Sequence, residues 1–412
     1  MALYKTPALS KTTMLIQIFI ALFAGIFIGI FTGITPGIHV NLVSATLLTL
    51  SPILLKYTSA LSLAIFIIAL AVTHSFLDTI PSIYLGAPDT ENALSVLPGQ
   101  RMLLKGEAYQ AVKITILGAY SGLIVAIAMV PLFILIANKI YPVLKPYLVF
   151  LLLGMIAFMI LREKQKFWSG LLFLLSGTLG VFTLSVPNFK EPLFPLLSGL
   201  FGVSGLLISF FDNTCIPEQK ISREIDFRAR ELAKVLGGSS IAVFLIQFFP
   251  GMGPAQGAVI SNQIVRDIKD KGYLALVGAM GTMSVVFSLV TFYTLGKAKD
   301  GAIVIISKLT QIELPSFLAL MATYMMAGSI AVFLVFFIAK KFSKLIVKVN
   351  YKMLVISIIA FIVLMSIIIN GPLGILVLVS STAIGLIAPL KNIGRSHAMG
   401  CLLLPVILYL LL

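Results

Sequence analysis

Two breaks rich in glycine and proline interrupt long apolar segments, and polar residues follow each break at helical spacing. They are residues 33–37 (Gly-Ile-Thr-Pro-Gly) and 250–254 (Pro-Gly-Met-Gly-Pro). A helix that begins inside the membrane after such a break exposes its first amide groups and the positive end of its dipole. We therefore predict an anion-binding site formed by Thr35, Pro36, Gly37, His39, Asn41, Ser44, Pro250, Gly251, Gly253, Gln256, Ser261 and Asn262.

The same breaks could serve the architecture alone, because a proline kink in a membrane helix need not bind a ligand. Gly25, Gly29, Gly33 and Gly37 recur every four residues, a stripe of small residues typical of closely packed helices. Both breaks also carry polar flanks, which packing does not require, and we therefore favour the binding interpretation.

A third polar group lies near the end of an apolar run and contains His74, Ser75, Asp78 and Thr79. His74 and Asp78 are four residues apart and share one face of a helix. Ionisable groups at membrane depth are costly and usually functional. The four residues are candidates for ion coupling: the pair could carry a proton, or Asp78 could hold Na⁺ with nearby carbonyls. A neutral pair that fixes two helices is the structural alternative.

The composition places the chain in a bilayer. Of its 412 residues 59% are hydrophobic and 11% charged, and the mean hydropathy is +1.09, whereas soluble domains contain about 25% charged residues. The net charge of +15 comes from short gaps between apolar runs, without a nucleic-acid motif. Basic cytoplasmic loops explain it, and we expect 266–272, 340–352 and 391–395 to be among them.

Collinear matches between the two halves indicate a duplication. Pro36-Gly37 and Pro250-Gly251 are 214 residues apart, Gly86 and Gly296 are 210 apart, and the offset only shrinks further along the chain. When the loop 340–352 is placed in the cytoplasm, the matched loop 139–145 lies on the other side. The predicted fold is an all-α polytopic membrane protein with two inverted-topology repeats, each with a Pro-Gly-broken helical hairpin and about five spanning helices.

The predicted organisation is a first transporter repeat at 1–217, a charged cytoplasmic connector at 218–236 and a second repeat at 237–412. The segment 86–113 is polar and rich in turn residues, so it could fold back into the protein as a gate or form a loop at the lipid surface. The connector alternates acidic and basic residues, as solvated segments do.

The sequence offers no catalytic site. It contains no H-E-x-x-H or G-x-S-x-G motif and no paired intramembrane carboxylates. The two cysteines, Cys215 and Cys401, and the three histidines are too scattered to predict a metal site. We expect a protein that is not an enzyme and that uses no cofactor beyond a coupling ion, H⁺ or Na⁺.

Short motifs spread over most of the chain resemble a known transporter family. They are Gly29-x-x-x-Gly33-x-x-Pro36-Gly37, the run 74–82 leading into 85–88, the pair 97–102 and 105–108, residues 250–253, and Arg395-Ser396-His397-Ala398-Met399-Gly400. The sequence resembles the large permease subunit of tripartite tricarboxylate transporters (the TctA type), particularly the stand-alone archaeal branch. The resemblance implies ion-driven uptake of carboxylates, with the two breaks and the run 74–82 lining the substrate site.

The predicted function is a secondary active transporter that moves a di- or tricarboxylate or another organic anion across the cell membrane by alternating access. A polyprenyl-phosphate translocase is the alternative, because the paired breaks would suit a phosphate head group equally well. A channel or an intramembrane enzyme is less favoured. The expected partners are membrane lipid and a small anionic substrate. The resemblance further implies a small membrane subunit or an extracytoplasmic binding protein. A homo-oligomer would also fit, and nucleic acid is not expected.

Overall fold

The computed structural model describes residues 11–36, 40–86, 96–187, 189–211, 216–222, 224–249, 252–266, 268–347 and 351–411. Within these ranges the regular structure is entirely helical, and seven helices are long and apolar enough to cross a membrane. This confirms the all-α polytopic class, while the inverted repeat and its boundaries stay predictions. Large apolar side chains such as Leu135 and Phe333 are exposed on the outer helices, as a lipid-facing surface requires.

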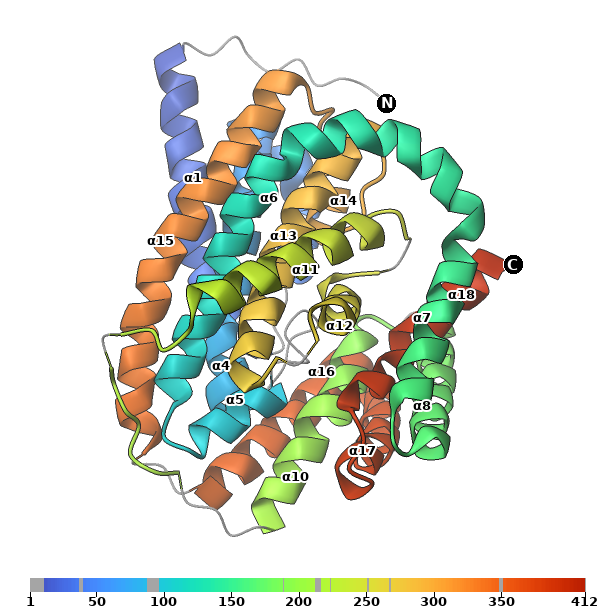
Figure 1. Cartoon of the computed structure of the whole chain (residues 1–412). Helices are drawn as coiled ribbons and strands as arrows, with labels where there is room; N and C mark the ends of the chain where they lie inside the picture. The colour runs from blue at the N-terminus through green and yellow to red at the C-terminus, as the bar shows by residue number, and fades with distance from the viewer. Residues whose placement is uncertain are drawn as a thin grey trace.

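The long helices form the frame shown in Figure 1. Their bounds are α1 (Lys11–Ile34), α3 (Ala60–Leu77) with its continuation α4 (Thr79–Tyr84), α6 (Ala108–Leu144), α8 (Lys166–Ser185), α13 (Asp270–Leu295), α15 (Leu314–Ile346) and α16 (Tyr351–Gly385). α16 bends at Gly371, whose φ is +65°, so that it consists of two consecutive helices. The predicted loops 139–145 and 340–352 are largely helical, because α6 and α15 continue into them.

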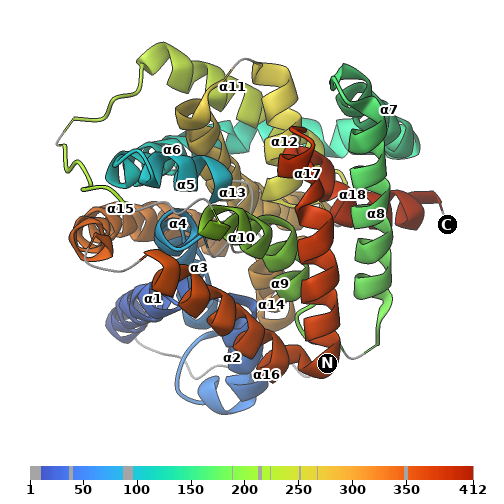
Figure 2. The ribbon, with the colours of Figure 1, turned by 90° about the horizontal axis from the view of Figure 1, so that it is seen from below.

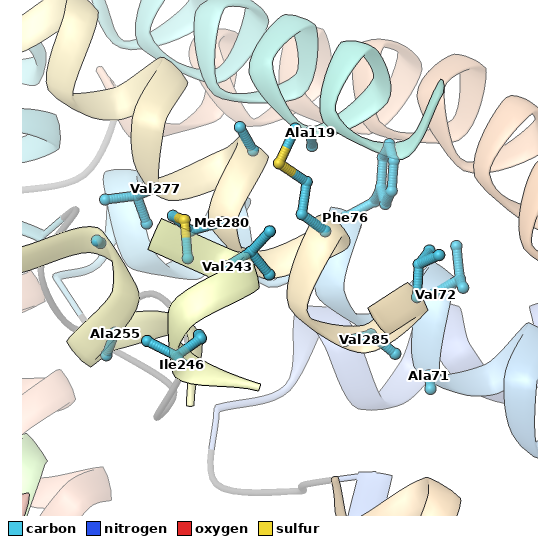
Figure 3. Packing of buried hydrophobic residues seen from close by; sticks show 14 of the residues in the cluster. Ala71, Val72, Phe76, Ala119, Val243, Ile246, Ala255, Val277, Met280 and Val285 are labelled. Atoms are coloured by element: carbon cyan, nitrogen blue, oxygen red, sulfur yellow. The ribbon is translucent and has the colours of Figure 1, made fainter. Parts of the chain in front are cut away.

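The centre of the molecule is the contact between α6 and α13, where small residues let the two backbones touch. A Cβ added at Gly118 would lie 2.0 Å from the carbonyl oxygen of Ala275, and one at Gly278 would lie 2.1 Å from that of Thr115. The hydroxyl of Thr282 donates a 2.7 Å hydrogen bond to Ala119 O across this interface. Figure 3 shows the apolar side chains that surround it. Such close approach is the usual source of helix association in lipid.

The glycine stripe in α1 serves helix packing, as its spacing predicts. A Cβ at Gly25 would lie 2.4 Å from Phe66 O on α3, and added Cβ atoms at Gly29 and Gly33 would also meet α3 within 3 Å. α1 therefore lies directly against α3, most of which is buried. Gly37, the last residue of the stripe, lies outside the described residues.

Short helices follow the two breaks. α2 (Val40–Leu54) follows the first, and α11 (Ala229–Ile246) and α12 (Pro254–Val265) flank the second. The 12 residues of α12 correspond to about 18 Å, too little to cross a bilayer. α11 and α12 pack against each other and against α13. A third short helix, α14 (Gly301–Leu309), joins α13 to α15 and packs on α2.

The remaining helices are α7 (Leu148–Arg162), α9 (Leu193–Leu197), the π-helical turn η3 (Ser198–Val203), α10 (Ser204–Phe211), α17 (Ile387–Leu390), η4 (Arg395–Met399) and α18 (Gly400–Leu411). In the view from below, α7, α17 and α18 lie on the side of the molecule opposite α1 and α15, and α9 and α10 lie between the two sides (Figure 2). α8 packs on α18, and α16 packs on η3, again through glycines that leave no room for a Cβ.

The described part of segment 86–113 folds back into the protein. α5 (Val96–Leu103) is mostly buried and packs against α4, α6 and α13. The connector lies against the turn after α5: the side chain of Gln219 donates to Leu103 O and accepts from the N–H of Ala108, each at 3.0 Å. The last part of the predicted connector is helical, because α11 begins at Ala229.

Candidate functional site

A cavity of about 220 Å³ lies where three short helices begin. α2 begins there with Val40, α12 with Pro254 and α14 with Gly301, while α3 and α13 form the walls. Part of the apolar lining, Ala71, Ala255 and Val285, appears in Figure 3. The polar lining consists of Asn41, His74, Ser75, Gln247, Gln256, Ser284, Ser288, Lys299 and Asp300.

The structure brings together predicted residues from both breaks and from the third polar group. Asn41, His74, Ser75, Gly253 and Gln256 all line this cavity. The other described candidates do not: Thr35 and Pro36 lie in the bend after α1, and Ser44, Asp78, Thr79 and Ser261 are buried elsewhere. Asn262 lines a different cavity. Four predicted residues fall outside the described chain, namely Gly37, His39, Pro250 and Gly251.

The start of α12 is capped by a side chain of the same helix. The N–H of Gly253 donates a 3.0 Å hydrogen bond to Oε1 of Gln256, three residues later. This bond holds the Gln256 side chain at the cavity wall, where only 3% of the residue is exposed. The positive end of the α12 dipole therefore faces the cavity.

Gln247 connects the end of α11 to α13. Its side-chain amide donates to Ser284 O at 3.2 Å, and its oxygen accepts from the hydroxyl of Thr291 at 3.5 Å. The turn that follows α11 is thus fixed against the wall that carries Ser284 and Ser288. On the opposite wall, His74 Nδ1 lies 3.0 Å from the hydroxyl of Thr32, which ties α3 to α1.

Lys299 is the main functional candidate that the sequence did not reveal. It lies in the link between α13 and α14, outside the spanning helices, and its ammonium group donates to the main-chain carbonyl of Ile246, the last residue of α11. Lys299 keeps some accessible surface toward the cavity, but protein atoms enclose its ammonium group. This loss of hydration lowers the pKa of Lys299 to about 7, because burial disfavours the charged form.

The neighbouring carboxylate does not neutralise Lys299. Asp300 Oδ1 accepts a 2.9 Å hydrogen bond from the N–H of Ala302 and so caps α14, while the Asp300 N–H donates to the hydroxyl of Ser288 at 3.0 Å. Across the described chain, no carboxylate lies within 4.0 Å of the Lys299 ammonium group. The cavity thus combines the starts of three helices, two of which carry side-chain caps, with a cation whose partner among the described residues is a main-chain carbonyl.

Part of this arrangement has a signal in the sequence. Asp300-Gly301 before an apolar run is a helix N-cap pattern, and it could have revealed α14. Lys299 itself belongs to the run Lys-Ala-Lys-Asp, which looks like any charged link at a membrane surface. The described residues contain no group of three or more His, Cys, Asp or Glu placed to hold a metal ion.

The chain is similar to known proteins over most of its length, and the matched range includes both breaks and Lys299. Residues 19–400 match the model of the tripartite tricarboxylate transporter TctA family. The chain is 31% identical over 387 residues to the uncharacterized protein MJ1079 of Methanocaldococcus jannaschii, and the match covers 91% of this chain and 94% of that protein. No solved structure matches the chain.

Proposed function

Because the chain belongs to the tripartite tricarboxylate transporter TctA family, we propose that it is a secondary transporter that binds a small carboxylate where α2, α12 and α14 begin. Family membership confirms the resemblance seen in the motifs. Together with the seven helices able to span a bilayer, it makes the chain a multi-pass membrane transporter. The substrate, the coupling ion and alternating access are parts of the proposal.

The observation that carries the proposal is the cation at the cavity wall, which has no carboxylate partner among the described residues. Removing an ammonium group from water is costly unless an opposite charge compensates it. A bound carboxylate would supply that charge to Lys299, and its second oxygen could accept from the amide groups at the start of α12. The cavity, about 220 Å³, is smaller than the roughly 300–1,000 Å³ of sites for drug-sized ligands, which favours a small organic acid.

The position of Lys299 also supports a coupling role. A bound anion stabilises the ammonium form, so binding near neutral pH takes up a proton. His74 and Ser75 line the same cavity and keep their predicted role in ion coupling within the proposal. Asp78 and Thr79 follow His74 by about one helical turn and are buried, so they would act from behind the cavity wall.

The test is uptake of labelled citrate and succinate by vesicles reconstituted with the full-length protein, with proton and sodium gradients applied separately. We expect Lys299→Gln to lower uptake at least about tenfold, because it removes the charge opposite the substrate. Lys297→Gln is the matched control: Lys297 lies two residues away in the same link, but it is exposed and contacts Tyr141.

Equal uptake by the two lysine variants and the native protein would contradict the proposed site. Absence of carboxylate uptake, together with movement of an isoprenyl phosphate between the leaflets, would favour the lipid-carrier alternative. The small membrane subunit and the extracytoplasmic binding protein remain proposed partners. Stimulation of uptake when they are added would support them.

A further inference from the structure

A second cavity of about 230 Å³ lies at the other end of α12 and α13. Its polar lining comes from the end of α5, the end of α12, the start of α13 with the residue before it, and the start of η4. These residues are Arg101, Asn262, Lys269, Asp270, Tyr273, Arg395 and Ser396, and Lys269 is exposed. On α13, Tyr273 in this cavity precedes Ser284 in the first cavity by a distance of about 16 Å along the helix axis. The two cavities share no lining residue.

Arg395 gives this cavity a cation that is only partly satisfied. Protein atoms surround most of its guanidinium group, and Nη1 donates a 3.0 Å hydrogen bond to Phe201 O. Nε is enclosed and has no hydrogen-bond partner, and in the part of the chain that the structure describes no carboxylate lies within 4.0 Å of Arg395. A guanidinium carries five N–H donors arranged to hold a carboxylate or phosphate, and one of these in Arg395, at Nε, lacks a partner among the described residues.

Arg101 provides a second cation whose partner can be exchanged. Its Nη2 lies 2.7 Å from Asp270 Oδ1, and the exposed fractions of the two side chains are 52% and 28%. An ion pair this exposed contributes little to stability, because water screens both charges. An anion that enters beside Arg395 can therefore compete with Asp270 for Arg101.

We propose that this cavity is a second anion-binding site, in which Arg395 and Arg101 together hold a small carboxylate. The preference for carboxylates rests on the proposed function, whereas the site itself rests on the two arginines. Lys269, Asp270 and Arg395 line the cavity and belong to the predicted cytoplasmic loops 266–272 and 391–395. The site would therefore receive the anion on the cytoplasmic side after it leaves the cavity at Lys299.

The two sites can be separated by equilibrium binding of labelled citrate, succinate and inorganic phosphate to the purified full-length protein. We expect two binding events per chain for a carboxylate. Arg395→Gln should weaken one of them at least about tenfold, and Lys299→Gln should weaken the other. Arg230→Gln, at an exposed position on α11, is the control that should change neither.

Asp270→Asn should strengthen anion binding at the second site, whereas the arginine variants should weaken it. It removes the carboxylate that competes for Arg101 and repels the ligand, so the second event should tighten by about three- to tenfold. Misfolding cannot produce this gain. If Arg395→Gln elutes as an aggregate in size-exclusion chromatography, Arg101→Gln replaces it with the same expected loss.

The outcomes distinguish the two proposals. Loss of only the Arg395-dependent event supports the second site, even where no Lys299-dependent event exists and the proposed function fails. A single event that responds to Lys299→Gln, but not to Arg395→Gln or Asp270→Asn, overturns the second site. Absence of binding for all three anions also overturns it, and a response to phosphate alone overturns the carboxylate assignment.

Discussion

The side-chain oxygen of Asn41 lies so close to Gly301 that a Cβ added to this glycine would be only 2.1 Å from it. The contact joins the start of α2, from the first half of the chain, to the start of α14, from the second half. Both residues line the cavity assigned to the substrate. The absence of a side chain at position 301 therefore determines where the Asn41 amide can lie.

Gly301→Ala should displace the Asn41 amide and weaken carboxylate binding by about tenfold, the value of one to two good hydrogen bonds. Binding of labelled citrate to the purified protein measures the effect. Gly281→Ala is the control, because an added Cβ there meets nothing within 4 Å. In the double variant Asn41→Ala/Gly301→Ala the clash is gone, so its affinity should equal that of Asn41→Ala alone. A further, additive loss would refute this explanation.

Carboxylate affinity should decrease as the pH rises through about 7, the value to which burial lowers the pKa of Lys299. Below that pH the ammonium group is charged and attracts the anion; above it the free site must first gain a proton, so affinity falls by up to about tenfold per pH unit. Among the described residues, the other ionisable groups at this cavity are His74 and Asp300. Dissociation constants measured between pH 6 and pH 9 test this.

Lys299→Arg shows whether Lys299 or His74 is the group whose titration causes the decrease in affinity. A guanidinium stays charged throughout this range, so the decrease above pH 7 should disappear even if the overall affinity is lower. His74→Gln should leave the decrease in place. If the decrease disappears with His74→Gln and persists with Lys299→Arg, the histidine is the titrating group.

Gly118→Ala should destabilise the contact between α6 and α13, because the new Cβ would lie 2.0 Å from Ala275 O. Overpacking of a well-packed interior typically costs about 1–3 kcal/mol, and here the obstacle is a main-chain carbonyl that cannot rotate away. Thermal unfolding in detergent should show a lower midpoint. Gly154→Ala on α7, where a Cβ meets nothing within 4 Å, should leave the midpoint unchanged, and equal midpoints for both variants would count against the interface.

Gln219→Ala should release the connector from the turn between α5 and α6. The variant loses the two 3.0 Å hydrogen bonds to Leu103 O and Ala108 N and leaves these main-chain groups to find water. Limited trypsin digestion should cut the connector several-fold faster, at Lys220 or Arg228. Glu231→Ala, at an exposed residue on α11, is the control. Unchanged cleavage would mean that other contacts hold the connector.

The spanning helices and part of the site could be predicted because both follow from local patterns. Long apolar runs determine the helices, and the proline–glycine breaks mark where α2 and α12 begin, which brings Asn41 and Gln256 to one cavity. The inverted relation between the halves stays a prediction. It derives only from the number of spans and the charge of the loops.

The rest of the site depends on how the segments between helices, such as the one between α13 and α14, pack against the protein. Local sequence patterns do not encode that packing. Lys299 reaches the cavity only because α14 turns inward after α13, so that an apparently exposed charge becomes enclosed. Asn262 is predicted at the substrate site but does not line that cavity. It follows Gln256 by six residues, or about 9 Å along α12, and this distance carries it to the second cavity.

α12 and α13 extend from one cavity to the other, and they meet next to the first cavity, where a Cβ on Gly257 would lie 2.2 Å from Met280 Cε. Each of the two helices contributes residues to the walls of both cavities. A shift of α12 against α13 that changes the shape of one cavity therefore changes the other as well. A ligand bound in one cavity would then alter the affinity of the other for its own ligand.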